Sequence, residues 1–360
     1  MKALALYLPQ FHEVAENNEW WGQGFTEWTN VKKARPLFAG HDQPQVPLGK
    51  TYYDLTDPDA LRWQSDLAQE YGLGGFIFFH YWSSGKLLLE KPTELYLNTQ
   101  DATTEFCLCW ANHPWTRSWD GKEHDVLQPQ TYGGRTDWDA HLDYLLPFFQ
   151  DNRYIRRDGK PVLFLYNARA IPDVDDMINH WTERLSEAGS PGLFIVEYIS
   201  SKNPEPAASS SAAVYEDEPV YSLRFQLSPM RLAKRFLVKR TDRIDMQDYE
   251  DVWARIRAKT RTYGGREIVQ GGFVGWDNSP RRGDKGPMIV RNGTPQSFER
   301  NLRKMLTKHR VDASQDFVVI NAWNEWGEGA MLEPTEKHSY AYLEALRNAI
   351  ETPTSAMRTS

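Results

Sequence analysis

Eight short, strongly apolar runs recur along this chain of 360 residues, and amphipathic stretches separate most of them. Continuous apolar runs are typical of strands buried on both faces, and such strands occur in parallel sheets covered by helices. The runs are residues 3–8, 74–82, 105–112, 161–167, 192–199, 212–216, 271–276 and 317–323. Eight parallel strands in a chain of this length predict an α/β fold, a single (β/α)8 TIM barrel.

Helical periodicity fills most of the intervals, near residues 60–72, around 136–150, at 177–189, around 248–260, at 297–310 and from 339 onward. No clear helix precedes the sixth run, and the serine-rich residues 207–211 come directly before it. An open doubly wound sheet is the alternative, but no glycine-rich phosphate loop follows any of the runs. We therefore predict one catalytic domain over residues 1–350 and a flexible tail over residues 351–360.

Long segments follow the first and third predicted strands, at residues 9–58 and 113–135. In a (β/α)8 barrel these βα loops lie at the C-terminal face, where active sites are built. Both segments are rich in tryptophan, in EWWGQGFTEW and in ANHPWTRSWDG. We expect the two long loops to line the site.

The charge balance argues against nucleic acid as a partner, because the net charge is −7 and the pI is about 5.8. No apolar run approaches the roughly 20 residues that span a bilayer. Pro9 and His12 interrupt the apolar N-terminus before it could form a signal-peptide core, which predicts a cytoplasmic protein. The only cysteines, Cys107 and Cys109, are expected to be buried thiols in a reducing compartment.

Aromatic residues are abundant, with 14 Trp, 17 Tyr and 16 Phe, and many of the tryptophans adjoin Asn, Asp, Glu, His or Arg. A large core with polar edges would account for any single one of them. Their repeated association with polar residues at predicted strand ends instead favours sugar binding, in which a flat ring contacts C–H bonds and polar groups bind hydroxyls. The expected partner is an oligosaccharide or polysaccharide.

Polar side chains recur where the predicted strands end, which places them on one rim of the barrel. They are His80, Tyr81, Asn112, Tyr166, Asn167, Glu197, Glu216, Trp276, Asp277, Asn324, Glu325 and Glu328. Each could serve only as a cap or a loop hydrogen bond. Their convergence on one rim favours a binding or catalytic site.

Two glutamates, Glu325 and Glu328, stand three apart in NAWNEWGEGAMLEP. The charge of one carboxylate and an apolar wall both raise the pKa of the other, which supplies the acid and the base that glycosidic cleavage requires. Gly327 and Gly329 would let the backbone turn both side chains toward one pocket. The alternative is a helix N-terminus with favourable first-turn glutamates, but the flanking tryptophans favour the catalytic interpretation.

Other chemistries lack their sequence signals. The nine histidines show no HExxH motif or paired spacing, and no calcium loop or GxSxG nucleophile elbow occurs. We expect no metal and no cofactor.

Six blocks of the sequence resemble a known family in order and spacing: LYLPQFH, EWWGQGFTEWTNV, HYWSSGKLLLEKP, CWANHPWTRSWDG, GWDNSPRRG and INAWNEWGEGAMLEP. They resemble the WbsX-type domain of bacterial polysaccharide gene clusters, a group that is similar to glycoside hydrolase family 99, the endo-α-mannosidase family. The likeness runs over roughly residues 1–348. It implies a (β/α)8 barrel with its site at the C-terminal face.

In family 99 the WNEWxEG-like segment carries two catalytic glutamates, which here match Glu325 and Glu328. The resemblance implies that Glu325 acts as base on the sugar 2-hydroxyl, giving a 1,2-anhydro sugar and net retention, and that Glu328 protonates the leaving oxygen. It also implies sugar contacts from Tyr7, His12, Trp28, His80, Trp110, Asn112, Asp120, Tyr166, Trp276 and Asp277, and the same motif adds Asn324 and Trp326.

The chain departs from the family pattern in two places. WbsX-type sequences usually read WANENW in the third block, whereas this chain has His113 in place of the glutamate. The usual VEFPP reads VYEDEP here, with Tyr215, Glu216 and Pro219. Both changes fall where substrate would be bound, so we expect a different sugar from that of relatives.

The sequence therefore predicts a glycoside hydrolase that cleaves α-linked, manno- or rhamno-configured sugars in a bacterial polysaccharide, with an endo-acting cleft. A glycosyltransferase of O-antigen or polysaccharide biosynthesis is the first alternative, although no glycine-rich nucleotide-binding pattern is seen. A non-catalytic carbohydrate-binding barrel is the second. It would keep the aromatic residues but would not need two facing carboxylates.

Overall fold

A closed barrel of eight parallel strands organises the part of the chain that this computed structural model describes, residues 1–117, 122–200, 203–224, 243–259, 261–309 and 317–351. Neighbouring strands pair in the order β1, β2, β4, β8, β9, β10, β12, β14 and back to β1. Their bounds are β1 (Lys2–Tyr7), β2 (Gly75–Ser83), β4 (Phe106–Trp110), β8 (Lys160–Leu165), β9 (Phe194–Ile199), β10 (Ala213–Glu216), β12 (Glu267–Phe273) and β14 (Phe317–Asn321). The predicted TIM barrel and its eight strands are confirmed.

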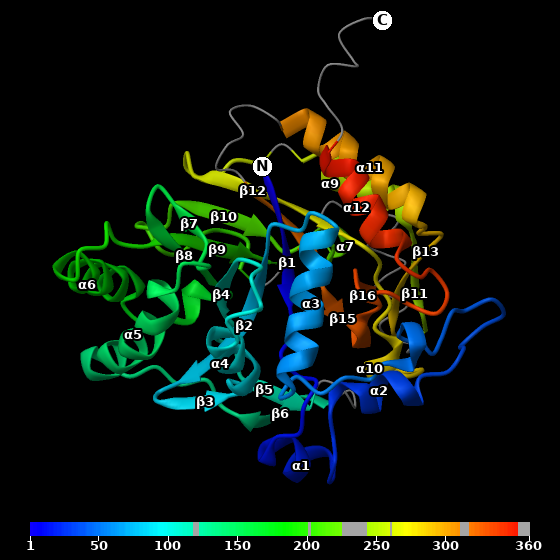
Figure 1. Ribbon diagram of the computed structural model, residues 1–360, viewed down its shortest axis with the longest axis horizontal. Helices are drawn as coiled ribbons and strands as arrows, with labels where there is room; N and C mark the ends of the chain where they lie inside the picture. Colours follow the sequence, from blue (N-terminus) through cyan, green and yellow to red (C-terminus); the bar gives the residue numbers. More distant parts are fainter. Residues whose placement is uncertain (118–121, 201–202, 225–242, 260, 310–316, 352–360) are drawn as a thin grey trace, which may run out of the picture.

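Helices surround the barrel (Figure 1), and six of them match the six predicted ones: α3, α5, α6, α9, α11 and α12. The α-helices are α1 (Ala15–Trp21), α2 (Glu27–Lys33), α3 (Pro58–Glu70), α4 (Lys91–Asn98), α5 (Arg135–Gln150), α6 (Val174–Glu187), α7 (Val220–Arg224), α9 (Tyr249–Arg257), α10 (Ser279–Arg282), α11 (Pro295–His309) and α12 (Ala341–Glu351). Short 3-10 turns occur at η1 (Leu48–Lys50), η3 (Ala168–Ala170) and η4 (Trp326–Glu328). The described residues between β9 and β10 contain no helix, as expected.

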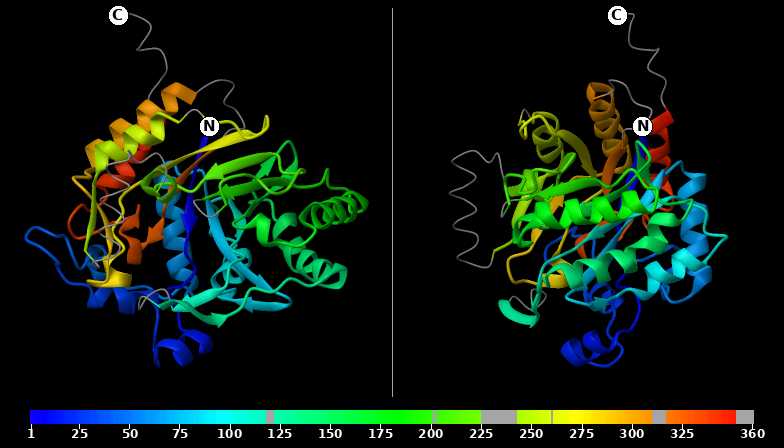
Figure 2. Two further views of the ribbon diagram at one scale, coloured as in Figure 1. Left: turned by 180° about the vertical axis from the view of Figure 1, so that it is seen from behind. Right: turned by 90° about the vertical axis from the view of Figure 1, so that its left-hand side faces the viewer.

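Local sequence explains where the helices begin. Asp57 caps α3 by accepting a hydrogen bond from the Asp59 amide, and Pro58 occupies the first helical turn, where its missing N–H costs nothing. Asp248 caps α9 in the same way. Figure 2 shows α5 beside α6 and α11 beside α12 on the outside of the barrel, and both pairs are in contact. The tail predicted for residues 351–360 lies outside the described residues except for Glu351, the last residue of α12.

Short additional strands lie outside the eight-stranded barrel order: β3 (Lys86–Leu88), β5 (Trp115–Arg117), β6 (Lys122–Gln128), β7 (Arg156–Arg157), β11 (Asp245–Asp248), β13 (Met288–Arg291), β15 (Asn324–Glu325) and β16 (Ala330–Met331). The β5–β6 hairpin, α1, α2 and α10 gather at the end of the barrel toward which β1 runs (Figure 1). This end is the C-terminal face, so both long βα loops lie where the sequence predicts them.

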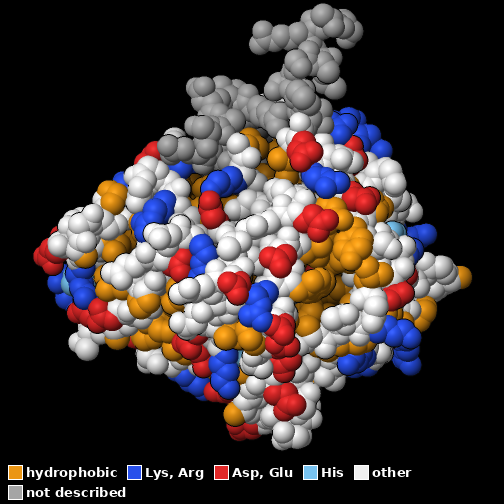
Figure 3. All heavy atoms as spheres, viewed as in Figure 1, with side chains coloured by type: hydrophobic (Ala, Val, Ile, Leu, Met, Phe, Trp, Pro, Cys, Tyr) orange, Lys and Arg blue, Asp and Glu red, His pale blue; other side chains and the backbone are white. Residues whose placement is uncertain are grey.

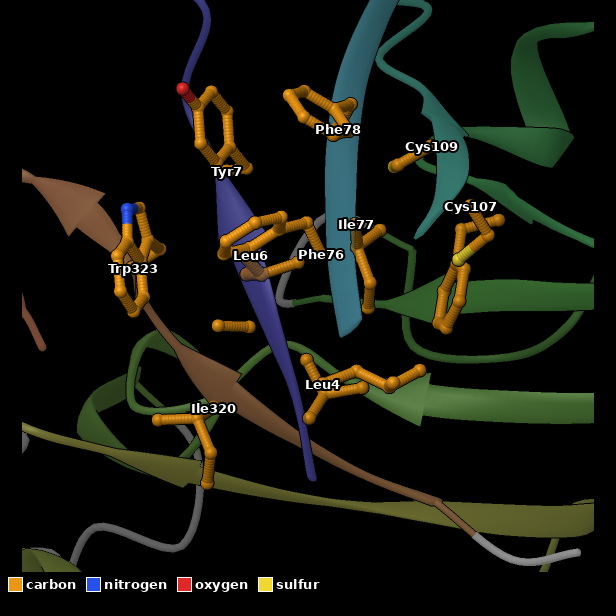
Figure 4. Close-up of a cluster of buried hydrophobic side chains, with 14 of the residues drawn as sticks. Leu4, Leu6, Tyr7, Phe76, Ile77, Phe78, Cys107, Cys109, Ile320 and Trp323 are labelled. Carbon is orange, nitrogen blue, oxygen red and sulfur yellow. The ribbon is translucent and has the colours of Figure 1, made fainter. Parts of the chain in front are cut away.

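Side chains along each barrel strand alternate between the interior and the helix layer. The Tyr7 hydroxyl donates to Gln64 Oε1 on α3 at 2.5 Å, so Tyr7 points outward. Its ring lies 4.2 Å from that of Phe78, centroid to centroid, in the same outer layer. Figure 4 shows both rings among buried side chains from both faces of the strands, to which β1, β2, β4 and β14 contribute. The two cysteines are free and fully buried, in agreement with the prediction.

The surface carries charges of both signs. On the face seen in Figure 3, acidic and basic side chains are interspersed, and no large area of one sign appears. Among the described residues, none of the helices is both long and apolar enough to cross a membrane.

Candidate active site

The segment after β14 forms a tight hairpin that presents both glutamates of the predicted pair. β15 pairs with β16 in antiparallel register, and η4 connects them. The turn closes at Gly329, whose φ of 61° lies in the left-handed region that favours glycine. The segment is tied to the barrel by Asn324, which binds the backbone of Leu8 through both its amide oxygen and its amide nitrogen. The two glutamates are therefore fixed at the mouth of the barrel.

A single guanidinium joins Glu325 and Glu328. Arg281, on α10 after β12, donates from Nη2 to Glu325 Oε2 at 2.8 Å and from Nη1 to Glu328 Oε1 at 2.6 Å. Its Nε donates to a third carboxylate, Glu27 Oε1 on α2, at 2.8 Å. All three contacts are charge-assisted hydrogen bonds, the strong kind in proteins. Three segments far apart in the sequence thus meet at one cation.

Gly327 makes this meeting sterically feasible. A Cβ atom at Gly327 would overlap Glu27 Oε1 and would lie 2.7 Å from Arg281 Nε. The space beside the Gly327 backbone is therefore already filled by the ion pair of Glu27 and Arg281. The glycine is required here for close approach rather than for a positive φ.

The cluster holds more negative than positive charge in a buried place. Burial, opposed by Arg281 and assisted by the charges of Glu328 and Glu27, raises the pKa of Glu325 to about 8. Burial likewise raises the pKa of Glu27. The Arg281 pKa, which burial alone would lower, is raised by its three carboxylate partners. Arg281 therefore stays charged, and the cluster holds a proton at neutral pH.

Tyrosines from the barrel interior adjoin the carboxylates. Tyr81 on β2 has a pKa raised by burial and then by the charge of Glu325, and Tyr166 has one raised by burial, by Asp217 and by Glu328. Asp217 follows β10, and burial together with Glu328 raises its pKa to about 7. These three side chains lie on or just after three strands, and each interacts electrostatically with one glutamate of the pair.

A shallow cleft lies beside Tyr81. Its walls come from β2, β3 and the β5–β6 hairpin and include Tyr81, Lys86, His113, Trp115 and Gln128. The His113 ring lies 5.2 Å from that of Tyr166, and the Trp115 ring lies 5.2 Å from that of Tyr81. Tyr81, which lines the cleft, also interacts electrostatically with Glu325, and the cleft contains the family departure at His113.

Three of the predicted contact residues face the helix layer instead of the barrel interior. Tyr7 binds α3, as described above. His80 Nε2 lies 2.9 Å from His141 Nε2 on α5, and burial lowers its pKa to about 3. The ring of Trp110 packs against His141 and Trp181 on α5 and α6. Because side chains alternate along a strand, Tyr81 rather than His80 faces the pair.

Other predicted residues organise the loops at this face. His12 is fully buried, and burial lowers its pKa. Asn112 is also fully buried, and its side chain binds both the N–H and the carbonyl of Asn167. Asn324 holds the hairpin to β1, as noted. These three positions support the loops that form the site.

The predicted tryptophans are mostly interior. Trp28 and Trp326 lie 5.4 Å apart, ring to ring, and are 4% and 1% exposed. The Trp326 Nε1 donates to Glu333 Oε2 at 2.6 Å, and burial raises the pKa of Glu333 to about 7. Trp276 is 6% exposed. This wall encloses the loop that carries the glutamates, and it does not form an open platform.

Asp277 fastens the first long loop to the loop after β12. Its Oδ2 lies 2.7 Å from His41 Nε2 and accepts a hydrogen bond from Gln43 Nε2 at 2.7 Å. Burial would raise the pKa of Asp277, but hydrogen bonds from His41, Gln43 and Ser279 lower it. The predicted contact at Asp120 lies outside the described residues.

Sequence reasoning assigned no role to Arg281, Glu27 or Asp217. Arg281 stands in the block GWDNSPRRG and Glu27 in EWWGQGFTEW, so both residues lie within blocks that resemble the family and could have been proposed from them. Asp217 lies in the segment that departs from the family pattern. Within the described ranges, no group of three or more His, Cys, Asp or Glu side chains could hold a metal ion. The carboxylates converge on Arg281 instead.

Comparisons with known proteins identify the family and the fold. A family model described as "Glycosyltransferase WbsX" matches residues 3–346. The chain is 36% identical over 351 residues to a protein of Xanthomonas campestris pv. campestris described as "Uncharacterized protein WxcX", covering 96% of this chain and 49% of that one. A second strain of the same organism carries a protein with the same identity and coverage. The chain thus spans about half the length of the curated relatives it matches.

Solved structures show the same fold. A "Glycoside hydrolase-like protein" superposes with a TM-score of 0.62 at 16% identity and covers 98% of this chain and 94% of that one. A GH99 endo-alpha-mannosidase from Bacteroides thetaiotaomicron, in complex with BIS-TRIS-propane, superposes with a TM-score of 0.55 at 12% identity. That match covers 97% of this chain and 96% of that one. At these identities the likeness shows the fold alone.

Proposed function

The chain belongs to the WbsX family, and on that premise we propose that it is a glycoside hydrolase that cleaves α-glycosidic bonds in a bacterial polysaccharide. The observation that carries the proposal is the contact of Glu325 and Glu328 with one buried guanidinium at the C-terminal face of the barrel. Two carboxyl groups in one pocket can share a proton unequally, and glycosidic cleavage needs one acid and one base.

We assign the base to Glu325 and the acid to Glu328. Glu325 removes the proton of the sugar 2-hydroxyl, O2 attacks C1, and the bond from C1 to the leaving oxygen breaks as Glu328 protonates that oxygen. Water then attacks C1 of the 1,2-anhydro sugar. Glu328 accepts the water proton, Glu325 returns its proton to O2, and the anomeric configuration is retained. Atoms and charges balance over the two steps.

Exposure supports this assignment, and the pKa of Glu325 sets the pH at which it can operate. The Glu328 side chain is 23% exposed and that of Glu325 is 10% exposed, so Glu328 lies nearer to departing saccharide and entering water. A base must be strong enough to take a hydroxyl proton yet ionised at the working pH. Burial raises the pKa of Glu325 to about 8, so Glu325 is ionised and able to act as the base only as the pH approaches or exceeds that value.

The substrate must carry a free 2-hydroxyl, which suits manno- or rhamno-configured sugars. We propose endo action, with neighbouring units of the chain lying across the surface between β3 and the β5–β6 hairpin. Tyr81 and Trp115 supply aromatic faces, and Lys86 and Gln128 supply polar groups. His113 replaces the glutamate that WbsX-type sequences usually have and lines the same cleft, so we propose that it alters which sugar is accepted.

The decisive experiment incubates wild type, Glu325→Gln and Glu328→Gln with α-mannans, rhamnans and bacterial O-antigen polysaccharides and detects released oligosaccharides by mass spectrometry. Glu344→Gln, at an exposed position on α12, is the matched control. We expect products from wild type and from the control only. Products that persist in both site variants would place the chemistry elsewhere.

Activated aryl glycosides then separate the two roles. A good leaving group needs no proton, so Glu328→Gln should regain activity on such substrates, whereas Glu325→Gln should not. The reverse pattern would exchange the assignments. A substrate that carries a 2-O-methyl group should not be cleaved by any variant.

A glycosyltransferase is the second candidate, because the matching family model is described by that activity. It predicts transfer of sugar from a nucleotide-sugar donor to a glycan acceptor. Saturable binding of such a donor, with no oligosaccharide release from any glycan, would favour it. A non-catalytic barrel would instead bind glycan tightly and return it intact from the wild-type complex.

A further inference from the structure

A third glutamate outside the proposed catalytic pair is buried against it. Glu27, the first residue of α2, is fully buried, and its Oε1 accepts a hydrogen bond from Arg281 Nε at 2.8 Å. The other carboxylate oxygen, Oε2, is also buried, and the Asn30 side chain helps Arg281 to lower the pKa of this carboxyl group against the effect of burial. Burial of a carboxylate is costly unless its charge is compensated. A carboxylate held in such a place calls for an explanation.

The contacts of Arg281 divide its guanidinium among three carboxylates. Nε reaches Glu27, while Nη1 and Nη2 reach Glu328 and Glu325. A guanidinium is planar, so fixing Nε fixes the directions of both terminal nitrogens. The Gly327 backbone closes the other side of Glu27 and leaves no room for that side chain to move toward the loop.

We propose that Glu27 is a positioning residue for the glutamate pair: it orients Arg281, and its negative charge keeps a proton on the pair. This inference rests on the proposed function of Glu325 and Glu328. Glu27 touches neither carboxylate through a hydrogen bond, and it acts through the guanidinium. The charge count gives the reason, because three carboxylates around one cation leave an excess that a single retained proton reduces.

The groups that face Glu325 come from four elements. They are Arg281 on α10, Glu328 on η4, Glu27 on α2 and Tyr81 on β2. Only Arg281 among them favours the ionised form of Glu325. Removing the charge of Glu27 leaves Arg281 to neutralise two carboxylates instead of three, so Glu325 should lose its proton at lower pH.

Glu27→Gln separates charge from geometry. The glutamine Oε1 can still accept the hydrogen bond from Arg281 Nε, so the orientation of the guanidinium is kept while the charge is lost. Glu27→Asp is the matched opposite, because it keeps the charge and shortens the side chain by one methylene. A purely structural role would make both variants alter stability without moving the titration of Glu325.

The measurement is a titration of the full chain labelled with ¹³C at glutamate side-chain carboxyls and followed by NMR. Glu325→Gln and Glu333→Gln assign two of the signals, and a direct comparison of wild type with Glu27→Asp assigns the third. Glu333 is an internal control, since its pKa is also raised, to about 7, and its partners are Tyr53, Gln64 and Trp326. Aspartate signals do not appear in this experiment.

We expect the titration midpoint of Glu325 to fall by about one pH unit or more in Glu27→Gln. The midpoint of Glu333 should not move, and Glu27→Asp should leave that of Glu325 high. An unchanged Glu325 midpoint in folded Glu27→Gln would overturn the proposal. The wild-type spectrum gives a second test that does not depend on any variant folding. Glu27 must be ionised over the pH range in which Glu325 titrates, and a protonated Glu27 in that range would also overturn the proposal.

Activity gives a separate readout. In Glu27→Gln the low-pH limb of kcat/KM should move to lower pH by the same amount as the NMR midpoint. A shifted midpoint without any glycan hydrolysis in wild type would support the role of Glu27 in the cluster and refute the proposed function. Hydrolysis with an unshifted midpoint would do the reverse.

Discussion

Gly327→Ala tests the close packing at the centre of the candidate site. The added methyl group would overlap Glu27 Oε1 and would lie 2.7 Å from Arg281 Nε and 3.0 Å from Glu27 Cδ. The separation from Arg281 is roughly 0.8 Å inside the optimal distance for non-bonded atoms. The backbone φ of Gly327 is not in the left-handed region, so the effect is steric contact alone.

The expected loss of folding stability depends on which side chains must move to admit the added methyl group. Overpacking a filled interior costs about 1–3 kcal/mol, and removing one partner of a buried ion pair costs about 3–5 kcal/mol. Glu27 and Arg281 are both buried, so the chain must accept one of these changes or a mixture of them. We therefore expect Gly327→Ala to lower the free energy of unfolding by about 2–4 kcal/mol.

The assay is urea denaturation at constant pH, followed by tryptophan fluorescence and by circular dichroism. Gly134→Ala is the control, because φ at Gly134 is −84° and a Cβ there would meet no atom within 4 Å. The control should remain within about 1 kcal/mol of wild type. In a Glu27→Ala background, Gly327→Ala should cost much less than in wild type, since the overlapping carboxylate is gone.

The reasoning would be refuted if Gly327→Ala unfolded within about 0.5 kcal/mol of wild type and retained full hydrolysis. It would also be refuted if the costs of Gly327→Ala and Glu27→Ala simply added in the double variant. Contacts that share one space should be coupled.

Four further outcomes follow from the site. Burial raises the folded pKa values of Glu325 and Glu333 to about 8 and about 7, above the ordinary value of 4.5. The stability that these groups contribute is therefore full below pH 4.5 and is lost as the pH rises through 7 and 8. In thermal melts, Glu325→Gln should raise Tm relative to wild type at pH 9 but not at pH 4. Glu333→Gln should cost about 1–3 kcal/mol in urea denaturation at pH 8, because its amide cannot accept all three hydrogen bonds from Tyr53, Gln64 and Trp326, and the penalty should shrink below pH 6, where Glu333 is itself protonated. If Glu325 is the base, kcat/KM should increase with pH through an apparent pKa near 8. A decrease through that pH would make Glu325 the acid. Tyr81→Phe should lower kcat/KM by about tenfold without changing Tm by much, and an unchanged kcat/KM would remove Tyr81 from the site.

Strand and helix positions could be predicted from the sequence because they depend on local patterns. Consecutive apolar residues at 317–323 or 74–82 have few alternatives to a buried parallel strand, and eight such runs have few arrangements other than a barrel. The glutamate pair could be proposed because Glu325 and Glu328 stand in one short motif with glycines and tryptophans. The family could be recognised from six such blocks.

The faces of the strands could not be predicted with the same success. In a strand that is buried on both sides, every residue is apolar or aromatic, and the pattern does not show which residues point inward. His80 and Tyr81 therefore looked equivalent, although one faces α5 and the other faces Glu325. The tryptophans were ambiguous for a related reason, because an aromatic residue beside a polar one can be either a sugar platform or a wall of the core.

The sequence by itself determined the barrel, the family and the two adjacent carboxylates, since each is encoded within a short stretch of neighbouring residues. Only the tertiary structure decided that Arg281 lies between them and Glu27, because these three segments stand 254 and 44 residues apart along the chain and meet through barrel closure. The properties that the proposed chemistry needs, a shared proton and a raised pKa at Glu325, arise from burial and from charges brought close together. Both depend on distances in space that no local pattern of residues specifies.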